Sequence, residues 1–135
     1  MPEPFSLGVA GAAKDIRDKG LSPVTLAESL LDRIDSLDPA LKAWVTIDRE
    51  EVIRTARGLE VELNEKGPRG PLHGVPFGVK DIIDTAEVRT THGSSFFREN
   101  IPSEDAECVR RLKEAGAILI GKCNTHEFAT ASTTK

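Results

Sequence analysis

The chain has 135 residues, enough for one ordinary domain and too few for two. Hydrophobic residues make up 39% of it and charged residues 30%, a balance typical of a globular protein rather than a disordered or fibrous one. The formal net charge is -4, with 18 scattered basic residues against 22 acidic ones, and aromatic residues amount to only 4%. This composition argues against a nucleic-acid partner, because phosphates attract clustered Lys and Arg and bases stack on aromatic side chains.

The sequence also argues against a membrane or secreted protein. No apolar run approaches the ~20 residues that a membrane-spanning helix needs. The first residues lack the basic stretch followed by an apolar stretch that marks a signal peptide. The two cysteines, Cys108 and Cys123, have neither CxxC spacing nor the density of a disulfide framework. We therefore expect a cytoplasmic protein with reduced thiols, and no feature calls for a cofactor.

The composition changes near Gly67, so we expect a single partial domain over 1–135, with a helical scaffold over 1–66 and an α/β portion over 67–135. A first helical pattern runs from about 7 to 18. A second begins with Ser22 as N-cap and Pro23 at the first helical position, where the missing N–H of proline is not needed.

The second helix is expected to end before Asp38-Pro39, because proline cannot continue the hydrogen-bond ladder. After a short apolar stretch at 44–47, Asp48 and Glu51 have the spacing of a capping box. The third helix should start there and end at Gly67-Pro68. These helices are interpreted as scaffold.

Residues 74–83 have the apolar density of a buried strand, with a proline near the start. A polar loop over 84–102 follows, and Ser103 is expected to cap a helix that stops at Gly116. Residues 117–121 form a second apolar run, predicted to be a strand parallel to the first. Residues 67–121 therefore predict a strand–helix–strand unit.

Two motifs have a structural explanation that is simpler than a functional one. Gly116 to Cys123 nearly match the phosphate-binding loop GxxxxGK[ST], but the intervening Ala-Ile-Leu-Ile is a strand and cysteine replaces the hydroxyl that would hold magnesium. A nucleotide site is therefore disfavoured. Asn124 and Glu127 have capping-box spacing and predict a short helix.

Histidines and serines in the α/β portion offer no clear site. His73, His92 and His126 are far apart and lack HxxxH spacing, so hydrogen-bonded or surface imidazoles are favoured over a metal site. Ser94 and Ser95 are followed by two phenylalanines and lack a glycine-rich turn that could supply oxyanion-hole amides. A structural turn is the favoured interpretation.

Lys80 is the principal candidate for chemistry, because it lies near the end of a very apolar strand. Alternation places Val75, Phe77 and Val79 on one face of that strand and Lys80 on the other. Burial penalises the charged form of an amine, so an enclosed lysine can serve as a base at neutral pH. The residues alone favour a simpler interpretation, an ion pair with Asp81 or Asp84.

Two separated motifs resemble one known family. Gly-Pro-Leu-His-Gly-Val-Pro-Phe-Gly-Val-Lys-Asp at 70–81 resembles the catalytic-lysine strand of the amidase signature family. The family's next conserved stretch is similar to Asp105-Ala106, Val109, Arg111-Leu112, Ala115-Gly116-Ala117, Gly121-Lys122, Asn124 and Glu127-Phe128-Ala129. The likeness is strong over about 67–134 and weaker over 1–66.

This resemblance implies an α/β/α enzyme with a mixed central sheet that hydrolyses, or transfers nitrogen across, a carboxamide C–N bond. Such enzymes use a serine–cis-serine–lysine triad, in which Lys80 would be the neutral amine that takes a proton from the bridging serine. Lys122 is assigned no proton-transfer role. By the same resemblance, Ala129, Thr130, Ala131 and Ser132 would approach a small-molecule amide substrate.

The resemblance also implies that both triad serines, and the glycine-rich loop around them, lie beyond this sequence. Ser94 and Ser95 precede the second motif, whereas the family's serines follow it. We therefore expect an N-terminal portion of an amidase that is inactive alone and that, with its sheet edges and apolar faces unpaired, either self-associates or is molten. The alternatives are a non-catalytic module that assembles with another chain and a small binding domain unrelated to amidases.

Overall fold

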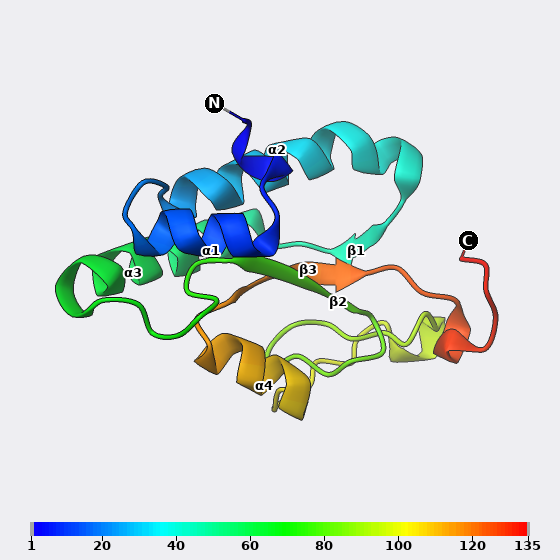
Figure 1. Ribbon diagram of the computed structural model, residues 1–135. Coiled ribbons are helices and arrows are strands. Elements are labelled where there is room, and N and C mark those ends of the chain that lie inside the picture. Colours follow the sequence, from blue (N-terminus) through cyan, green and yellow to red (C-terminus); the bar gives the residue numbers. More distant parts are fainter. Residues whose placement is uncertain (1, 135) are drawn as a thin grey trace.

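The computed structural model describes residues 2–134, and its elements alternate between helices and short strands (Figure 1). The helices and strands are α1 (Val9–Arg17), α2 (Pro23–Leu41), β1 (Trp44–Thr46), α3 (Arg49–Lys66), β2 (Pro76–Lys80), α4 (Glu107–Glu114) and β3 (Ile118–Cys123). Three single-turn 3-10 helices complete them: η1 (Pro4–Ser6), η2 (Ser95–Phe97) and η3 (Glu127–Ala129).

The sheet is mixed and has the strand order β1-β3-β2. The predicted parallel pairing is confirmed, since β2 runs parallel to β3, while β1 pairs antiparallel with the other edge of β3. The register of β2 and β3 shifts once, because Phe77 pairs with Leu119 but Gly78 pairs with Gly121. Ile120 is therefore an extra residue on β3, a β-bulge.

The sheet lies between two unequal layers (Figure 1). On one side, α2 and α3 bury an apolar core that includes Leu31, Val52 and Leu59 together with Ile118 and Ile120 of β3. On the other side lie α4 and the loop that leads to it. This arrangement confirms the predicted α/β class with a mixed sheet. Within residues 2–134, no helix combines the length and the apolar character that crossing a bilayer requires.

The start of α2 is as predicted, but its end is not. The Ser22 hydroxyl accepts hydrogen bonds from the backbone N–H groups of Val24 and Thr25, at 3.0 and 3.4 Å. The expected stop before Pro39 is wrong, because α2 continues to Leu41 with Pro39 in its last turn. The Asp38 carboxylate compensates by accepting from the N–H groups of Ala43 and Trp44, which ties the helix end to β1.

Two other predicted caps are wrong. α4 begins at Glu107 after an Ala106 N-cap rather than at Ser103, and the Asp105 carboxylate instead binds the Ala86 N–H and the Lys113 ammonium. Asn124 does not cap a helix either. Its side chain donates to the Lys42 carbonyl at 2.9 Å and accepts from the adjacent N–H.

The starts of β2 and β3 are fixed against α3 by His73, which is 2% exposed. Its Nδ1 accepts from the Arg69 N–H at 2.8 Å, so Nε2 carries the proton that is donated to the Leu59 carbonyl at 2.7 Å. Gly116, with φ +95°, passes so close that an added Cβ would lie 2.6 Å from the His73 Cα. A side chain would not fit between the two backbones, so position 116 requires glycine.

Candidate functional site

The parallel strands β2 and β3 end at the same edge of the sheet, where Lys80 pairs in register with Cys123. The carboxyl edge of parallel strands is where open α/β sheets place their ligand sites, because the following loops diverge there. The backbone continues this contact past the strand, since the Asp81 N–H donates to the Cys123 carbonyl at 2.9 Å. The candidate site is built around this edge.

Lys80 is exposed, so the prediction of a dry, buried amine is wrong for this chain. β2 pairs on only one side among the described residues, and the exposure of its last three residues alternates, with Val79 buried between exposed Gly78 and Lys80. The simpler alternative is also wrong. Within residues 2–134, Lys80 makes no ion pair, and the Asp81 carboxylate lies beside Lys122 instead.

The buried lysine is Lys122, whose side chain is fully enclosed. Its ammonium donates to the Ile83 carbonyl at 2.8 Å and to the hydroxyls of Thr85 and Thr90 at 3.1 and 2.5 Å. One Asp81 carboxylate oxygen lies 3.7 Å away. Burial lowers the pKa of Lys122, while Asp81 and then Asp84 oppose that shift.

These contacts define what we call the Lys122 cluster, which consists of Asp81, Thr85, Thr90, Thr91 and Lys122. The Asp81 carboxylate completes it by accepting from the Thr91 N–H at 3.2 Å and from the Thr91 hydroxyl. Sequence reasoning noted Lys122 only within a motif. A lysine inside an apolar strand is itself a signal, because burial of such a side chain requires a charged or polar partner.

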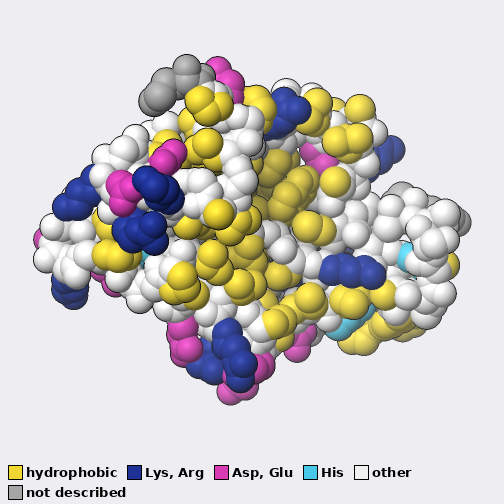
Figure 2. Space-filling view, viewed as in Figure 1, with side chains coloured by type: hydrophobic (Ala, Val, Ile, Leu, Met, Phe, Trp, Pro, Cys, Tyr) yellow, Lys and Arg dark blue, Asp and Glu magenta, His cyan; other side chains and the backbone are white. Residues whose placement is uncertain are grey.

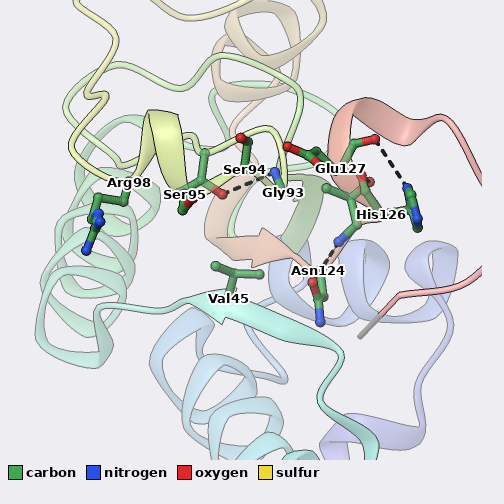
Figure 3. A pocket seen from close by; sticks show the side chains of 10 residues that line it. Val45, Gly93, Ser94, Ser95, Arg98, Asn124, His126 and Glu127 are labelled. Atoms are coloured by element: carbon green, nitrogen blue, oxygen red, sulfur yellow. Dashed lines mark hydrogen bonds between the residues drawn. The ribbon is translucent and has the colours of Figure 1, made fainter.

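A cavity of about 450 Å³ opens beside this edge of the sheet (Figure 3). Asn124, Thr125 and His126, which directly follow β3, form one wall, and Ser94 and Ser95 come from the facing loop. Ser94 is 5% exposed and precedes η2, which agrees with the predicted structural turn. The cavity walls are therefore mainly polar loop residues.

The other two histidines, His92 and His126, contact residues near this edge of the sheet. His92 lies against Phe97 and Phe128, with ring centroids 5.2 and 6.1 Å away. His126 Nδ1 lies 3.3 Å from both the Glu127 carbonyl and the Thr130 hydroxyl. Within residues 2–134, no three His, Cys, Asp or Glu side chains are grouped as ligands for a metal ion.

The predicted substrate-contacting residues, Ala129, Thr130, Ala131 and Ser132, lie at and after η3. Thr130 donates its hydroxyl to the Glu127 carbonyl at 2.9 Å, and the next two residues are exposed. Their contact with a substrate stays a prediction. Both cysteines are free thiols, and burial raises the pKa of Cys123 beside Lys80.

Comparison with known proteins identifies the family. The family model described as Amidase matches residues 25–135. The chain therefore belongs to the amidase family, as its two motifs indicated.

Its relatives include a glutamyl-tRNA(Gln) amidotransferase subunit from Carboxydothermus hydrogenoformans, 38% identical over 98% of this chain and 27% of that protein. The protein of the same description from Roseiflexus sp. is 42% identical over 85% of this chain and 23% of that protein. The chain thus spans about a quarter of the length of the curated relatives it matches.

Solved structures give the same result. The native peptide amidase from Stenotrophomonas maltophilia superposes with a TM-score of 0.88 and 34% identity, over 96% of this chain and 27% of that chain. An amidase family protein from Bacillus anthracis superposes with a TM-score of 0.85 and 32% identity, over 98% and 27% of the two chains.

Proposed function

We propose that this chain contributes the lysine base of an amidase. The enzyme would hydrolyse the C–N bond of a carboxamide or transfer the amide nitrogen. The observation that carries the proposal is the place of Lys80, the last residue of β2, at the carboxyl edge that β2 and β3 share, where it pairs with Cys123. Asn124, Thr125 and His126, which follow Cys123, line the polar cavity, while Lys80 itself does not. Membership in the amidase family and the motif at 70–81 support it.

The proposed chemistry uses a serine–cis-serine–lysine triad, of which this chain holds only the lysine. The Lys80 amine would accept the proton of the bridging serine, which in turn accepts that of the nucleophilic serine as it attacks the amide carbon. The C–N bond then breaks, the amine leaves with a proton, and water or ammonia takes the acyl group. An ammonium cannot act as a base, so the proposal requires that Lys80 be enclosed in the working enzyme.

The test measures ammonia or amine release from a panel of carboxamides by this chain and by a chimeric enzyme. In the chimera, this chain replaces the matching part of the Stenotrophomonas maltophilia peptide amidase. We expect activity only from the chimera, and Lys80→Met to lower kcat about a thousandfold, the scale of a lost general base. Lys66→Met, at the exposed end of α3, is the matched control. A folded Lys80→Met chimera with full activity would contradict the proposal.

A second candidate, a module that assembles with another chain, is supported by the free edge of β2. Hydrophobic side chains gather across the centre of the face that contains β2, between α1 and α4 (Figure 2). A strand edge that is unpaired among residues 2–134, beside apolar surface, favours association. One relative is by name a subunit, and one structural neighbour is described as a vestigial protein complex. Sedimentation equilibrium of this chain checks the candidate, since a monomer at all concentrations would argue against self-assembly.

A further inference from the structure

Lys122 is a cation whose three donors are all used. The ammonium has three N–H groups, and it has three acceptors within 3.1 Å, namely the Ile83 carbonyl and two threonine hydroxyls. The Asp81 carboxylate at 3.7 Å supplies a compensating charge, and both side chains are completely buried. Because the Ile83 carbonyl and two threonine hydroxyls take all three donors, the contacts fit a structural ion rather than a second base.

The direction of the Lys122 side chain follows from the β-bulge. Simple alternation along β3 would place Lys122 on the same face as Ile118 and Ile120, which pack into the helical core. The extra residue at Ile120 reverses the alternation, and Lys122 pairs with Val79 and faces the loop after β2. Lys80, the next residue after Val79, lies on the opposite face.

The Lys122 cluster holds the backbone on the C-terminal side of Lys80. The Ile83 N–H donates to the Lys80 carbonyl at 3.0 Å, while the Ile83 carbonyl accepts from Lys122 at 2.8 Å. The Asp81 carbonyl accepts from the His92 N–H at 2.8 Å. The turn that follows Lys80 is thus fixed at its start, at its end and against the returning loop.

We propose that Lys122 is a positioning residue, whose buried contacts with Ile83, Thr90 and Asp81 fix the turn after β2 and thereby the direction of the Lys80 side chain. This inference rests on the proposed function, because it explains how a lysine at a strand end can be held in one orientation. Precise placement of a base matters, since a displacement of about 1 Å can cost about a hundredfold in rate.

The first experiment tests the turn in this chain, by hydrogen exchange with mass spectrometry. Lys122→Met keeps the length of the side chain and removes the charge and donors. We expect protection over residues 81–92 to fall about tenfold or more, with protection in α3 changed less than about twofold. Lys66→Met is the control. Unchanged protection over 81–92, or an equal loss in α3, would overturn the proposal.

Thr90→Val provides a second variant that keeps the ion pair if Lys122→Met does not fold. It removes one acceptor of Lys122 at nearly constant shape, and Thr25→Val, at an exposed position on α2, is its matched control. The same local loss of protection is expected, to a smaller degree.

The second experiment tests positioning, in the chimeric enzyme. We expect Lys122→Met to lower kcat per folded molecule about a hundredfold with little change in KM, and to add nothing to Lys80→Met. If Lys122 only stabilises the fold, Lys122→Met would lower the amount of folded enzyme and leave kcat per folded molecule unchanged. That result would overturn the proposal. Full activity of Lys80→Met would overturn the proposed function instead, while the exchange experiment would still decide whether Lys122 holds the turn.

Discussion

The two faces of β3 are stabilised by different interactions. Toward α2 and α3, its side chains enter an apolar core with Leu31 and Leu59, where shape and burial supply the free energy. Toward the 84–102 loop, Lys122 enters a polar layer in which charge must be matched by acceptors. The helical face should therefore tolerate changes that preserve volume, whereas the loop face should not.

The largest effect is expected where the buried charge loses its counterion. Asp81→Ala leaves Lys122 buried without its nearest carboxylate and should lower the free energy of unfolding by about 3–5 kcal/mol. Urea denaturation followed by circular dichroism measures this. Glu104→Ala, at an exposed position, is the control. Equal losses in the free energy of unfolding from the two substitutions would contradict the expected difference between the two faces of β3.

The apolar face should respond to lost volume. Leu31 is 1% exposed, and Leu31→Ala should cost about 3 kcal/mol, whereas Leu31→Met should cost less than about 1.5 kcal/mol because it preserves volume. Leu37→Ala, at a position 40% exposed on the same helix, is the control. The same urea assay measures these variants. A costly Leu31→Met together with a harmless Lys122→Met would contradict the expected difference between the two faces.

A smaller effect is expected at the start of the helical layer. Ser22→Ala removes the side-chain acceptor of two N–H groups of α2 and should cost about 1 kcal/mol. Ser36→Ala, at an exposed position where the hydroxyl only donates to the Arg33 carbonyl, is the control. Thermal melting that gives the same midpoint for both variants would show that the cap contributes nothing.

The smallest effect concerns the surface of α4, where charge is exposed. Hydrogen bonds from Arg110 and then Arg111 lower the pKa of Glu107 to about 2. A carboxylate with a lowered pKa stabilises the fold above its unfolded value of 4.5, and this contribution is lost as the pH falls toward about 2. Carbon-13 NMR of the Glu107 carboxyl should give that midpoint, and added salt should raise it because the pair is exposed. A midpoint near 4.5 at low salt would contradict these contacts.

Local signals predicted much of the fold. Ser22 caps α2, Asp48 accepts from the Glu51 N–H at the start of α3, and β2 and β3 are parallel strands around a helix. In each case the interacting residues are close in sequence or belong to one periodic segment. The wrong caps at Ser103 and Asn124 differ, because distant residues bond at or near them. Ala86 binds Asp105, two residues after Ser103, and the Lys42 carbonyl binds the Asn124 side chain.

The motifs around Lys80 and Lys122 were enough to indicate the family, and periodicity and caps were enough to predict the order of helices and strands. Which lysine is buried depends on the strand pairing, which local patterns do not contain. Alternation assigns a side chain to a face only while strand pairing is regular, and the bulge at Ile120 breaks that regularity. It turns Lys122 into the polar layer, while Lys80 remains exposed at the edge of the sheet.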